Sequence, residues 1–345
     1  MSSRLRVAVV GLGIGSHHAR VVAGSGKAEL VALCDASTAR LEHCGKELAV
    51  KTLFNDYKKM LRETRPDAVI VATPNVHHAP ITIAALNAGA HVLCEKPMAM
   101  NTREALRMAD AADRKKRKLM INFSYRFTPA AWALKQIVDS GAVGDVYYAK
   151  TRWHRNRGIP GFGGWFGQKK LSGGGPLIDL GVHRIDMAMW LMGDPNPVSV
   201  SGSTYNKLGS ALARKMKKSF DVEDLAVALI RFDNGATLIA EISWMLNGER
   251  NEDMATYLYG TKAGICHRNL GDSYDYEACI FGEIGGVYAT SKVKIPVHGP
   301  NSVSHFLDVV TEGVKPIVTP QQGINVMKVL DGIYKSAELG REVRL

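Results

Sequence analysis

Short apolar runs alternate with helical patterns along the first 125 residues. Each apolar run predicts a buried strand, and these runs are residues 4–10, 29–34, 68–72, 91–94 and 119–123. The helical segments between them are residues 17–23, 38–48, 55–65, 79–88 and 103–112. Strands that alternate with helices indicate a mostly parallel sheet covered by helices. Residues 1–125 are therefore predicted to form one α/β domain with a mostly parallel sheet.

The pattern changes after Arg126. One helix, residues 132–140, is followed by strand-like segments at residues 146–153, 198–205, 225–232, 236–245, 255–260, 265–269 and 287–293. Such a run predicts an α+β domain, residues 126–345, with a large and mostly antiparallel open sheet. The sequence Asp233-Asn234-Gly235 is typical of a hairpin turn between two of these strands. A final helix, about residues 323–338, is expected to pack back toward the first domain.

A glycine-rich turn follows the first predicted strand directly. Gly11, Gly13, Ile14 and Gly15 lead into a helix, and glycines at such a turn let the backbone approach a pyrophosphate. The N–H groups at the helix start would receive its negative charge. The third glycine departs from the usual spacing. It is typically three residues after the second glycine, but Gly15 follows Gly13 by only two. The turn therefore predicts the cofactor site of a Rossmann dinucleotide-binding domain, residues 1–125.

An acidic residue ends the second predicted strand. Asp35 lies about twenty residues beyond the glycines, where a carboxylate accepts hydrogen bonds from ribose hydroxyls. It would also repel a 2′-phosphate, so NAD is favoured over NADP, although the nearby Arg40 keeps NADP possible. The alternative interpretation is a helix cap, with Asp35 placed before Ser37 and Thr38.

Two further turns follow predicted strands of the same domain. Residues 73–78 come after the strand at 68–72, and residues 95–97 come after the strand at 91–94. Ligands bind at the carboxyl ends of the strands in an open parallel sheet. The candidate cofactor contacts in these turns are Thr73, Pro74, Asn75, His78, Glu95 and Lys96. His77 and His78 lack the cysteine or carboxylate partners of a metal site, so no metal is predicted.

A long glycine-rich connection precedes the most suggestive pair of side chains. Residues 158–175 form the connection, and Pro176 suits the first turn of a helix that carries Asp179 and His183. A spacing of four puts these two side chains on one helix face, where the carboxylate can orient the imidazole. The pair is therefore a candidate acid/base catalyst. The alternative is an ordinary charge pair on a helix.

Composition narrows the class of protein. Hydrophobic residues make up 46% and charged residues 22% of the 345 residues, a usual balance for a soluble globular protein of two domains. The formal charge of +11 raises nucleic acid as a partner, but the basic cluster at residues 114–118 lies where a helix end is expected, so nucleic-acid binding is not predicted. No segment is long enough to span a membrane.

Two features of the chain indicate the cytoplasm. The five cysteines form no close pair and leave an odd number, which suggests neither a disulfide framework nor a zinc site. The N-terminal apolar run at residues 7–10 breaks at Gly11, so it is not a secretion signal.

Together these motifs resemble the glucose-fructose oxidoreductase, inositol dehydrogenase and MocA family. The matching segments are residues 11–18, Asp35, residues 73–78, Glu95-Lys96-Pro97, Arg126-Phe127, residues 173–183 and residues 316–337. The resemblance covers nearly the whole chain and implies a nicotinamide-dependent oxidoreductase that acts on a sugar or polyol. It also implies that one face of the second sheet pairs subunits into a dimer or tetramer.

The reaction expected from these residues is reversible oxidation of a secondary alcohol, with hydride passing to the cofactor. Lys96 would polarise the reacting oxygen, and His183, oriented by Asp179, would take or give the hydroxyl proton. Candidate substrate contacts are Arg126, Trp153, Arg155 and Trp165. Trp153 and Arg155 suit a carbohydrate platform, or equally a strand end in solvent.

Two alternative functions stay open at this point. In one, the same cofactor is used transiently, so that a keto-sugar forms, a glycoside leaves by elimination, and the ketone is reduced again. In the other, the chain is a catalytically silent sensor of a sugar or nucleotide on the same scaffold.

Overall fold

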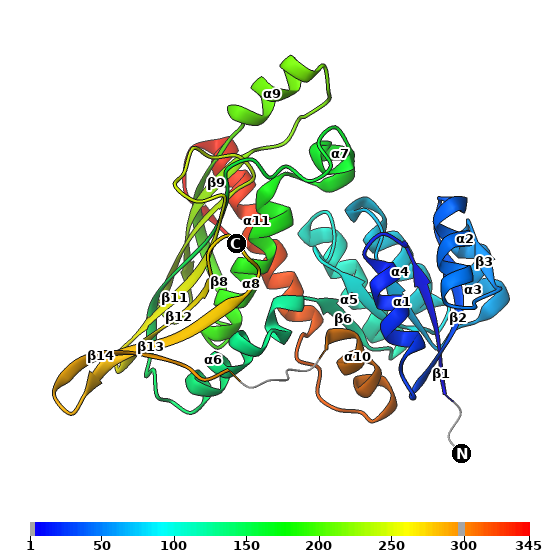
Figure 1. Ribbon diagram of the computed structural model, residues 1–345, viewed down its shortest axis with the longest axis horizontal. Helices are drawn as coiled ribbons and strands as arrows, with labels where there is room; N and C mark the ends of the chain where they lie inside the picture. The colour runs from blue at the N-terminus through cyan, green and yellow to red at the C-terminus, as the bar shows by residue number, and fades with distance from the viewer. Residues whose placement is uncertain (1–3, 296–300) are drawn as a thin grey trace. The chain divides into compact units, whose positions relative to one another are not determined.

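The chain folds into two compact units, seen in the computed structural model, which describes residues 4–295 and 301–345 (Figure 1). Among these residues, the first unit contains 4–122 and 301–324, and the second contains 123–295 and 325–345. The division expected from the sequence, at 125/126, left 301–324 with the second domain. In the structure this segment belongs to the first unit, and helix α11 (Pro320–Leu339) crosses the boundary at 324/325.

The first unit is built on a six-stranded parallel sheet with the strand order β3-β2-β1-β4-β5-β6. Its strands are β1 (Leu5–Val10), β2 (Ala28–Cys34), β3 (Leu53–Phe54), β4 (Ala68–Val71), β5 (His91–Glu95) and β6 (Leu119–Asn122). This is the doubly wound order in which the chain direction across the sheet reverses at β1 and β4. The predicted Rossmann fold is confirmed, and β1, β4 and β5 are neighbours whose carboxyl ends share one edge.

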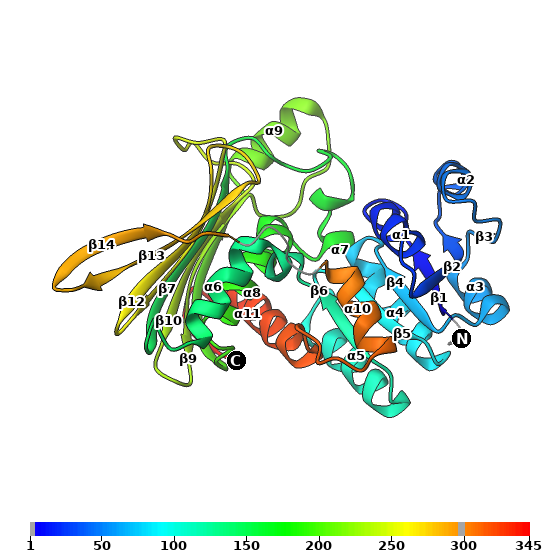
Figure 2. The same ribbon diagram turned by 60° about the horizontal axis from the view of Figure 1, so that its bottom comes forward.

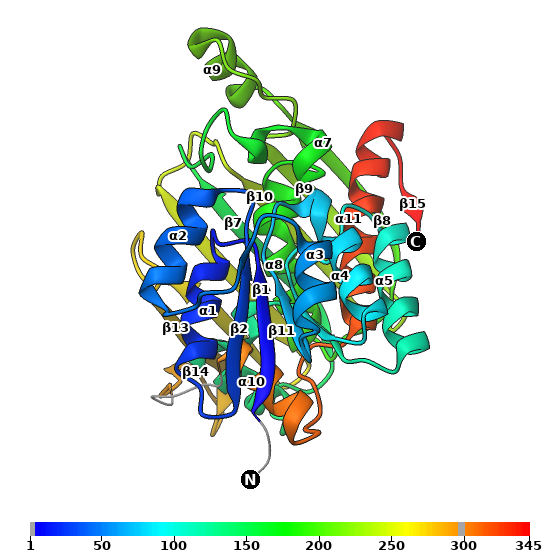
Figure 3. The ribbon, with the colours of Figure 1, turned by 90° about the vertical axis from the view of Figure 1, so that its right-hand side faces the viewer.

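Helices cover both faces of this sheet. They are α1 (Gly15–Ala23), α2 (Thr38–Glu47), α3 (Tyr57–Thr64), α4 (His78–Asn87), α5 (Thr102–Lys115) and α10 (Ser302–Thr311), with a short 3₁₀ turn η1 (Asn75–His77) before α4. Helices α1 and α2 lie on one side and α3, α4 and α5 on the other (Figure 3). Because both faces are covered, β4 and β6 are buried along their whole length.

The second unit contains a nine-stranded sheet in the order β14-β13-β12-β11-β7-β10-β9-β8-β15. Its strands are β7 (Val146–Arg155), β8 (Pro197–Tyr205), β9 (Leu225–Phe232), β10 (Thr237–Ser243), β11 (Glu252–Gly260), β12 (Ala263–Asn269), β13 (Tyr276–Ile284), β14 (Val287–Lys292) and β15 (Val343–Arg344). All neighbours are antiparallel except β7 and β10. The predicted open antiparallel sheet is confirmed, and the hairpin turn joins β9 to β10 with Gly235 at a φ of +84°.

Helices pack on one face of this second sheet. They are α6 (Pro129–Asp139), α8 (Val182–Leu191) and the part of α11 in this unit, while α7 (Lys169–Ser172) and α9 (Leu208–Met216) lie on connections at its edge (Figures 1 and 2). Alternate residues of β9 from Ala226 to Phe232 are buried, and those between them are half-buried. In the described residues no helix covers the opposite face of the sheet (Figure 2).

Among residues 4–295 and 301–345, no helix is both long enough and apolar enough to cross a membrane.

Candidate active site

The glycine turn of the first unit passes close to the end of strand β4. Gly11 has a φ of +89°, and a Cβ at this position would overlap the carbonyl group of Ala72. A Cβ on Gly13, by contrast, would meet no atom within 4 Å, and α1 begins two residues later at Gly15. Open space beside a glycine backbone and a helix start is the arrangement that accepts a pyrophosphate. The residues present therefore fit a dinucleotide.

Asp35 holds the glycine turn against β2. Its Oδ2 accepts the Leu12 N–H at 2.6 Å, and its Oδ1 accepts the Ser37 N–H at 2.7 Å. The Arg40 guanidinium lies 3.1 Å from the same Oδ1. The cap of α2 is Ser37, whose Oγ accepts the Arg40 N–H. Asp35 thus supports the glycine turn through its hydrogen bond to Leu12, and it also pairs with the Arg40 guanidinium.

A buried network lies behind Lys96. Glu95 of β5 contacts the His18 ring of α1 at 2.7 Å and accepts a hydrogen bond from Asn122 of β6 at 2.5 Å. Burial by itself raises the pKa of Glu95, but the hydrogen bond and charge of His18, with the help of Asn122, outweigh burial and lower it. The other carboxylate oxygen accepts the Lys96 N–H at 3.2 Å. The backbone of Lys96 is therefore fixed by three secondary-structure elements.

His78 joins the two turns that follow β4 and β5. Its ring nitrogens lie 2.8 Å from the Thr73 carbonyl oxygen and 2.7 Å from the Pro97 carbonyl oxygen. Burial lowers the pKa of His78, and the two carbonyl contacts offset this only in part. The side chain thus organises the backbone of both turns, and Asn75 is buried beside it at the start of η1.

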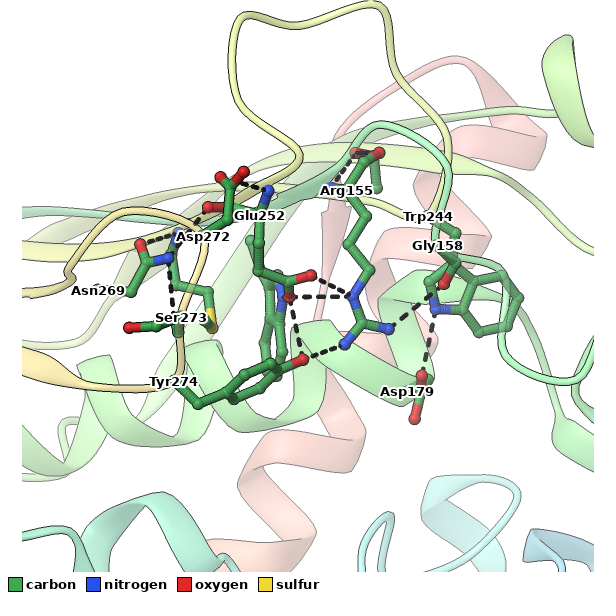
Figure 4. A network of polar contacts seen from close by, with 12 residues as sticks. Arg155, Gly158, Asp179, Trp244, Glu252, Asn269, Asp272, Ser273 and Tyr274 are labelled. Carbon is green, nitrogen blue, oxygen red and sulfur yellow. Dashed lines mark hydrogen bonds and ion pairs between the residues drawn. The ribbon is translucent and has the colours of Figure 1, made fainter.

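In the second unit, Asp179 and His183 lie on one continuous helical segment. A π-helical turn, η4 (Leu177–Gly181), precedes α8, so Asp179 sits in a wider turn than the expected α-helix. Such turns occur frequently at functional sites. Both side chains are almost buried, each with 7% exposure. The Asp179 carboxylate accepts a hydrogen bond from the indole N–H of Trp244 at 3.1 Å (Figure 4).

A buried carboxylate caps the start of this segment. Glu223 accepts the N–H of Gly175 at 2.9 Å and the N–H of Leu177 at 3.1 Å, and Tyr334 of α11 donates its hydroxyl to Glu223 at 2.9 Å. A Cβ on Gly174 would overlap the Tyr334 hydroxyl, so the close approach requires glycine there. Burial raises the pKa of Glu223, although these hydrogen bonds act in the opposite direction.

Aromatic rings surround the His183 imidazole. The Tyr125 ring centroid lies 4.8 Å from that of His183 at an edge-on angle of 60°, and the Trp153 centroid lies at 6.1 Å. Tyr274, which is 53% exposed, packs 6.2 Å from Trp153. Together Tyr125, Trp153 and Tyr274 form an aromatic wall beside the candidate acid/base group. Ring faces of this kind suit the C–H groups of a sugar.

A polar network continues from this wall (Figure 4). Glu252 accepts hydrogen bonds from the Trp153 indole at 2.5 Å, from Arg155 Nε at 3.0 Å and from the Tyr274 hydroxyl at 3.1 Å. Arg155 also donates to the Tyr274 hydroxyl at 2.5 Å. The arginine lies between Glu252 with Tyr274 on one side and Trp244 with Asp179 on the other (Figure 4). The structure thus brings the predicted Trp153 and Arg155 together near Asp179.

The other two candidate substrate contacts lie elsewhere. Arg126 is completely buried and binds Asp186 of α8 through Nη2 at 2.6 Å, so its charge serves the packing of the unit. We therefore leave Arg126 out of the proposed substrate contacts. Trp165 lies in the glycine-rich connection, where its ring stacks on Phe166 with the centroids 3.9 Å apart.

Six residues that sequence reasoning did not single out belong to this half of the site. They are Tyr125, Glu223, Trp244, Glu252, Tyr274 and Tyr334. The only signal in the sequence is that Tyr125 directly precedes the Arg126-Phe127 pair. The other five lie far from Asp179 in the sequence, and their role arises from contacts.

These features define a dinucleotide-dependent oxidoreductase of the Rossmann class. The chain belongs to the GFO/IDH/MocA family, because the family model described as an oxidoreductase family with an NAD-binding Rossmann fold matches residues 5–123. The model of the GFO/IDH/MocA C-terminal domain matches residues 132–266. The resemblance inferred from the motifs is confirmed.

Named relatives and solved structures agree with this assignment. The D-glucoside 3-dehydrogenase of Escherichia coli (strain K12) is 32% identical over 100% of this chain and 98% of its own length. The scyllo-inositol 2-dehydrogenase (NAD(+)) of Bacillus subtilis (strain 168) is 27% identical over 92% of this chain and 90% of its own. The levoglucosan dehydrogenase complex with NADH and levoglucosan is 25% identical, covers 99% of both chains, and has a TM-score of 0.85.

Proposed function

We propose that the protein oxidises a ring secondary alcohol of a pyranose glycoside or cyclitol, reversibly, with NAD as the hydride acceptor. The observation that carries this proposal is the buried pair of Asp179 and His183, held beside an aromatic wall. An acid/base imidazole next to sugar-binding rings suits alcohol oxidation. The relative that is 32% identical is named a D-glucoside 3-dehydrogenase, which favours a D-glucoside oxidised at C3.

The cofactor site supports NAD rather than NADP. The bound nicotinamide would supply hydride chemistry at its C4. Gly11, Gly13, Ile14 and Gly15 would hold its pyrophosphate, and Asp35 would bind the ribose hydroxyls and repel a 2′-phosphate. The Arg40 charge that would otherwise attract this phosphate is paired with Asp35. The turns organised by His78 and Glu95 would position the nicotinamide end.

The chemical step needs one electrophilic group and one proton acceptor. In this proposal the Lys96 ammonium donates a hydrogen bond to the reacting oxygen, and a ring nitrogen of His183 takes the hydroxyl proton during oxidation. Asp179 keeps the imidazole oriented and stabilises its protonated form. Tyr274, the exposed ring of the wall, would stack on the C–H face of the sugar, and the buried Trp153 would support it from behind.

The test is oxidation of a substrate panel by the purified protein with NAD. Formation of the reduced nicotinamide band with glucosides, inositols or free pyranoses supports the proposal, and product analysis identifies the ketone carbon. Release of the aglycone without net reduction of NAD would instead show the transient-oxidation reaction. Binding of NAD without turnover of any sugar or polyol would overturn the proposal.

Substitutions then test the residue roles. Lys96→Ala and His183→Ala should each slow turnover by about 100- to 10,000-fold while the melting temperature and NAD affinity stay close to those of the parent. Glu249→Gln, an exposed change in the second unit, is the matched control. A lower melting temperature with an unchanged rate per folded molecule would show that His183 is structural.

We further propose a cytoplasmic homo-oligomer. All five cysteines are unpaired and buried, which fits a reducing compartment. The half-buried apolar residues of β9 on the helix-free face, such as Val227 and Leu229, support pairing of subunits through this sheet.

A further inference from the structure

Arg184, the residue after the proposed acid/base His183, carries a deeply buried charge. Its side chain has no exposed surface, and none of its three guanidinium nitrogens has a hydrogen-bond acceptor among the described residues. Burial lowers the pKa of Arg184 to about 10, which still leaves the group charged at neutral pH. A guanidinium has five N–H donors and no acceptor, so this side chain requires an acceptor that the surrounding residues do not supply.

A second buried side chain near Arg184 shows the same feature. His267 of β12 is fully buried, and neither of its ring nitrogens has a partner within the described part of the chain. Its ring stacks on Tyr276 with the centroids 4.5 Å apart. Burial, and then the positive charge of Arg184, lower the pKa of His267 well below its usual value. The ring is therefore neutral and has one N–H to donate.

The carboxylates of β11, a strand that packs against α8, are engaged by other groups. Asp253 pairs with Arg152 at 2.6 Å and with Arg250 at 3.2 Å. Glu252 accepts hydrogen bonds from Arg155 and Trp153. Both carboxylates are thus bound to partners other than Arg184.

Contacts on one face of the sheet bring Arg184 and His267 together. The Thr151 hydroxyl lies 3.5 Å from the Arg184 carbonyl oxygen and 2.6 Å from the Thr256 hydroxyl, and Thr256 stands opposite His267 in the β11–β12 pair. The Tyr276 ring, which stacks on His267, has its centroid 5.9 Å from that of Tyr125. A buried site with one cation and one imidazole N–H suits an anion.

We propose that Arg184 and His267 hold a small monovalent inorganic anion of halide size between α8 and the sheet of the second unit. A buried charge is tolerated in proteins when it is paired and hydrogen-bonded. Water would accept hydrogen bonds from the guanidinium but would leave its charge uncompensated. A halide would accept the hydrogen bonds and also neutralise the charge. The anion would anchor α8 at the residue next to His183.

Thermal unfolding at fixed ionic strength tests this site without any use of the enzyme's activity. Sodium bromide replaces the sodium salt of morpholinoethanesulfonate stepwise, because this anion is too large for a buried site and is neither a sugar nor a polyol. An anion that binds only the folded state should raise the melting temperature of the full-length protein by about 3–5 °C for each tenfold increase above its dissociation constant. Arg184→Met should lose this dependence. Arg214→Met, an exposed change in α9, should keep it.

Crystals of the parent protein soaked in bromide provide the second measurement, which does not depend on the folding of any variant. The proposal expects an anomalous peak within hydrogen-bonding distance of the Arg184 guanidinium and a ring nitrogen of His267. Water alone at this position would overturn the proposal. So would equal melting temperatures in bromide and morpholinoethanesulfonate, or a bromide dependence that Arg184→Met retains. None of these outcomes bears on the proposed dehydrogenase activity.

Discussion

The variant Glu223→Ala tests how the start of the helical segment that carries Asp179 and His183 is held. The Glu223 carboxylate accepts hydrogen bonds from the Gly175 N–H at 2.9 Å, the Leu177 N–H at 3.1 Å and the Tyr334 hydroxyl at 2.9 Å. Glu223→Ala removes both acceptor oxygens, and with them all three hydrogen bonds, in one step. The two backbone donors and the phenol would then lie buried without a carboxylate to bind.

The expected loss of stability follows from these three bonds. A buried polar group left unpaired costs about 1–3 kcal/mol, and water that enters the vacated space offsets part of this cost. We therefore expect Glu223→Ala to lower the free energy of unfolding by about 3 kcal/mol. At about 2–4 °C per kcal/mol, the melting temperature should fall by about 6–12 °C. Tyr334→Phe removes one bond and should cost about 1–2 kcal/mol.

The pH dependence of this residue has a defined sign. Because burial raises the folded-state pKa of Glu223, its contribution to the free energy of unfolding is full below the unfolded value, about 4.5, and decreases as pH rises through the folded pKa. The stability of the parent relative to Glu223→Gln should therefore decrease as the pH rises above 4.5. Urea unfolding at several pH values measures this difference.

Glu249→Gln removes an exposed carboxylate of the same unit and should change stability by less than about 0.5 kcal/mol. If Glu223→Ala were as stable as this control, the cap would contribute nothing and the reasoning above would fail.

Other changes test the remaining parts of the two half-sites. Trp244→Phe deletes the N–H that Asp179 accepts at 3.1 Å, so it should slow turnover and shift the pH profile, and unchanged kinetics would contradict this role. Asp35→Ala should narrow the preference for NAD in calorimetric titration, and tighter NADP binding by the parent would refute the cofactor proposal. Hydrogen bonds lower the pKa of Glu95 despite burial, so its stabilising contribution is present above about pH 4.5 and is lost as the pH falls. Glu95→Gln should therefore weaken the dependence of unfolding on acid, as measured by circular dichroism. An unchanged acid midpoint would disprove this. Light scattering should give a mass above the 37.6 kDa of one chain, and the single-chain mass would exclude the oligomer.

The sequence predicted those helices and strands whose pattern of apolar residues lies within one short segment. Strands of the first unit are short apolar runs, and each connecting helix has its own periodicity, so the parallel sheet follows from the alternation. Two strands of the second sheet, β13 and β15, were missed. In β13, Glu277 and Glu283 interrupt the apolar residues, and β15 has only two residues. Residues 301–324 belong to the first unit because of tertiary packing, which has no local signal.

In the candidate site, too, residues close together in the sequence were predictable and residues brought together by folding were not. Asp179 and His183 stand four residues apart beside a glycine run, so one segment of sequence identified both. Glu223 and Tyr334 reach that segment from 48 and about 160 residues away, and only the folded chain brings them together. The wider turn at Asp179 also escaped prediction, since the sequence pattern of a π turn differs little from that of an α-helix.

Helix α8 has no solvent-facing side, so each of its polar residues lies in the interior of the protein. All ten residues from Val182 to Leu191 are buried, and a helix buried all round is normally apolar. Yet α8 carries His183, Arg184 and Asp186, which project in different directions around its axis. Asp186 binds Arg126, and the His183 ring packs against Tyr125. Polar contacts on several sides fix the rotation of the helix as well as its position. The proton transfer proposed for His183 requires such fixation, because a misplacement of about 1 Å can cost roughly 100-fold in rate.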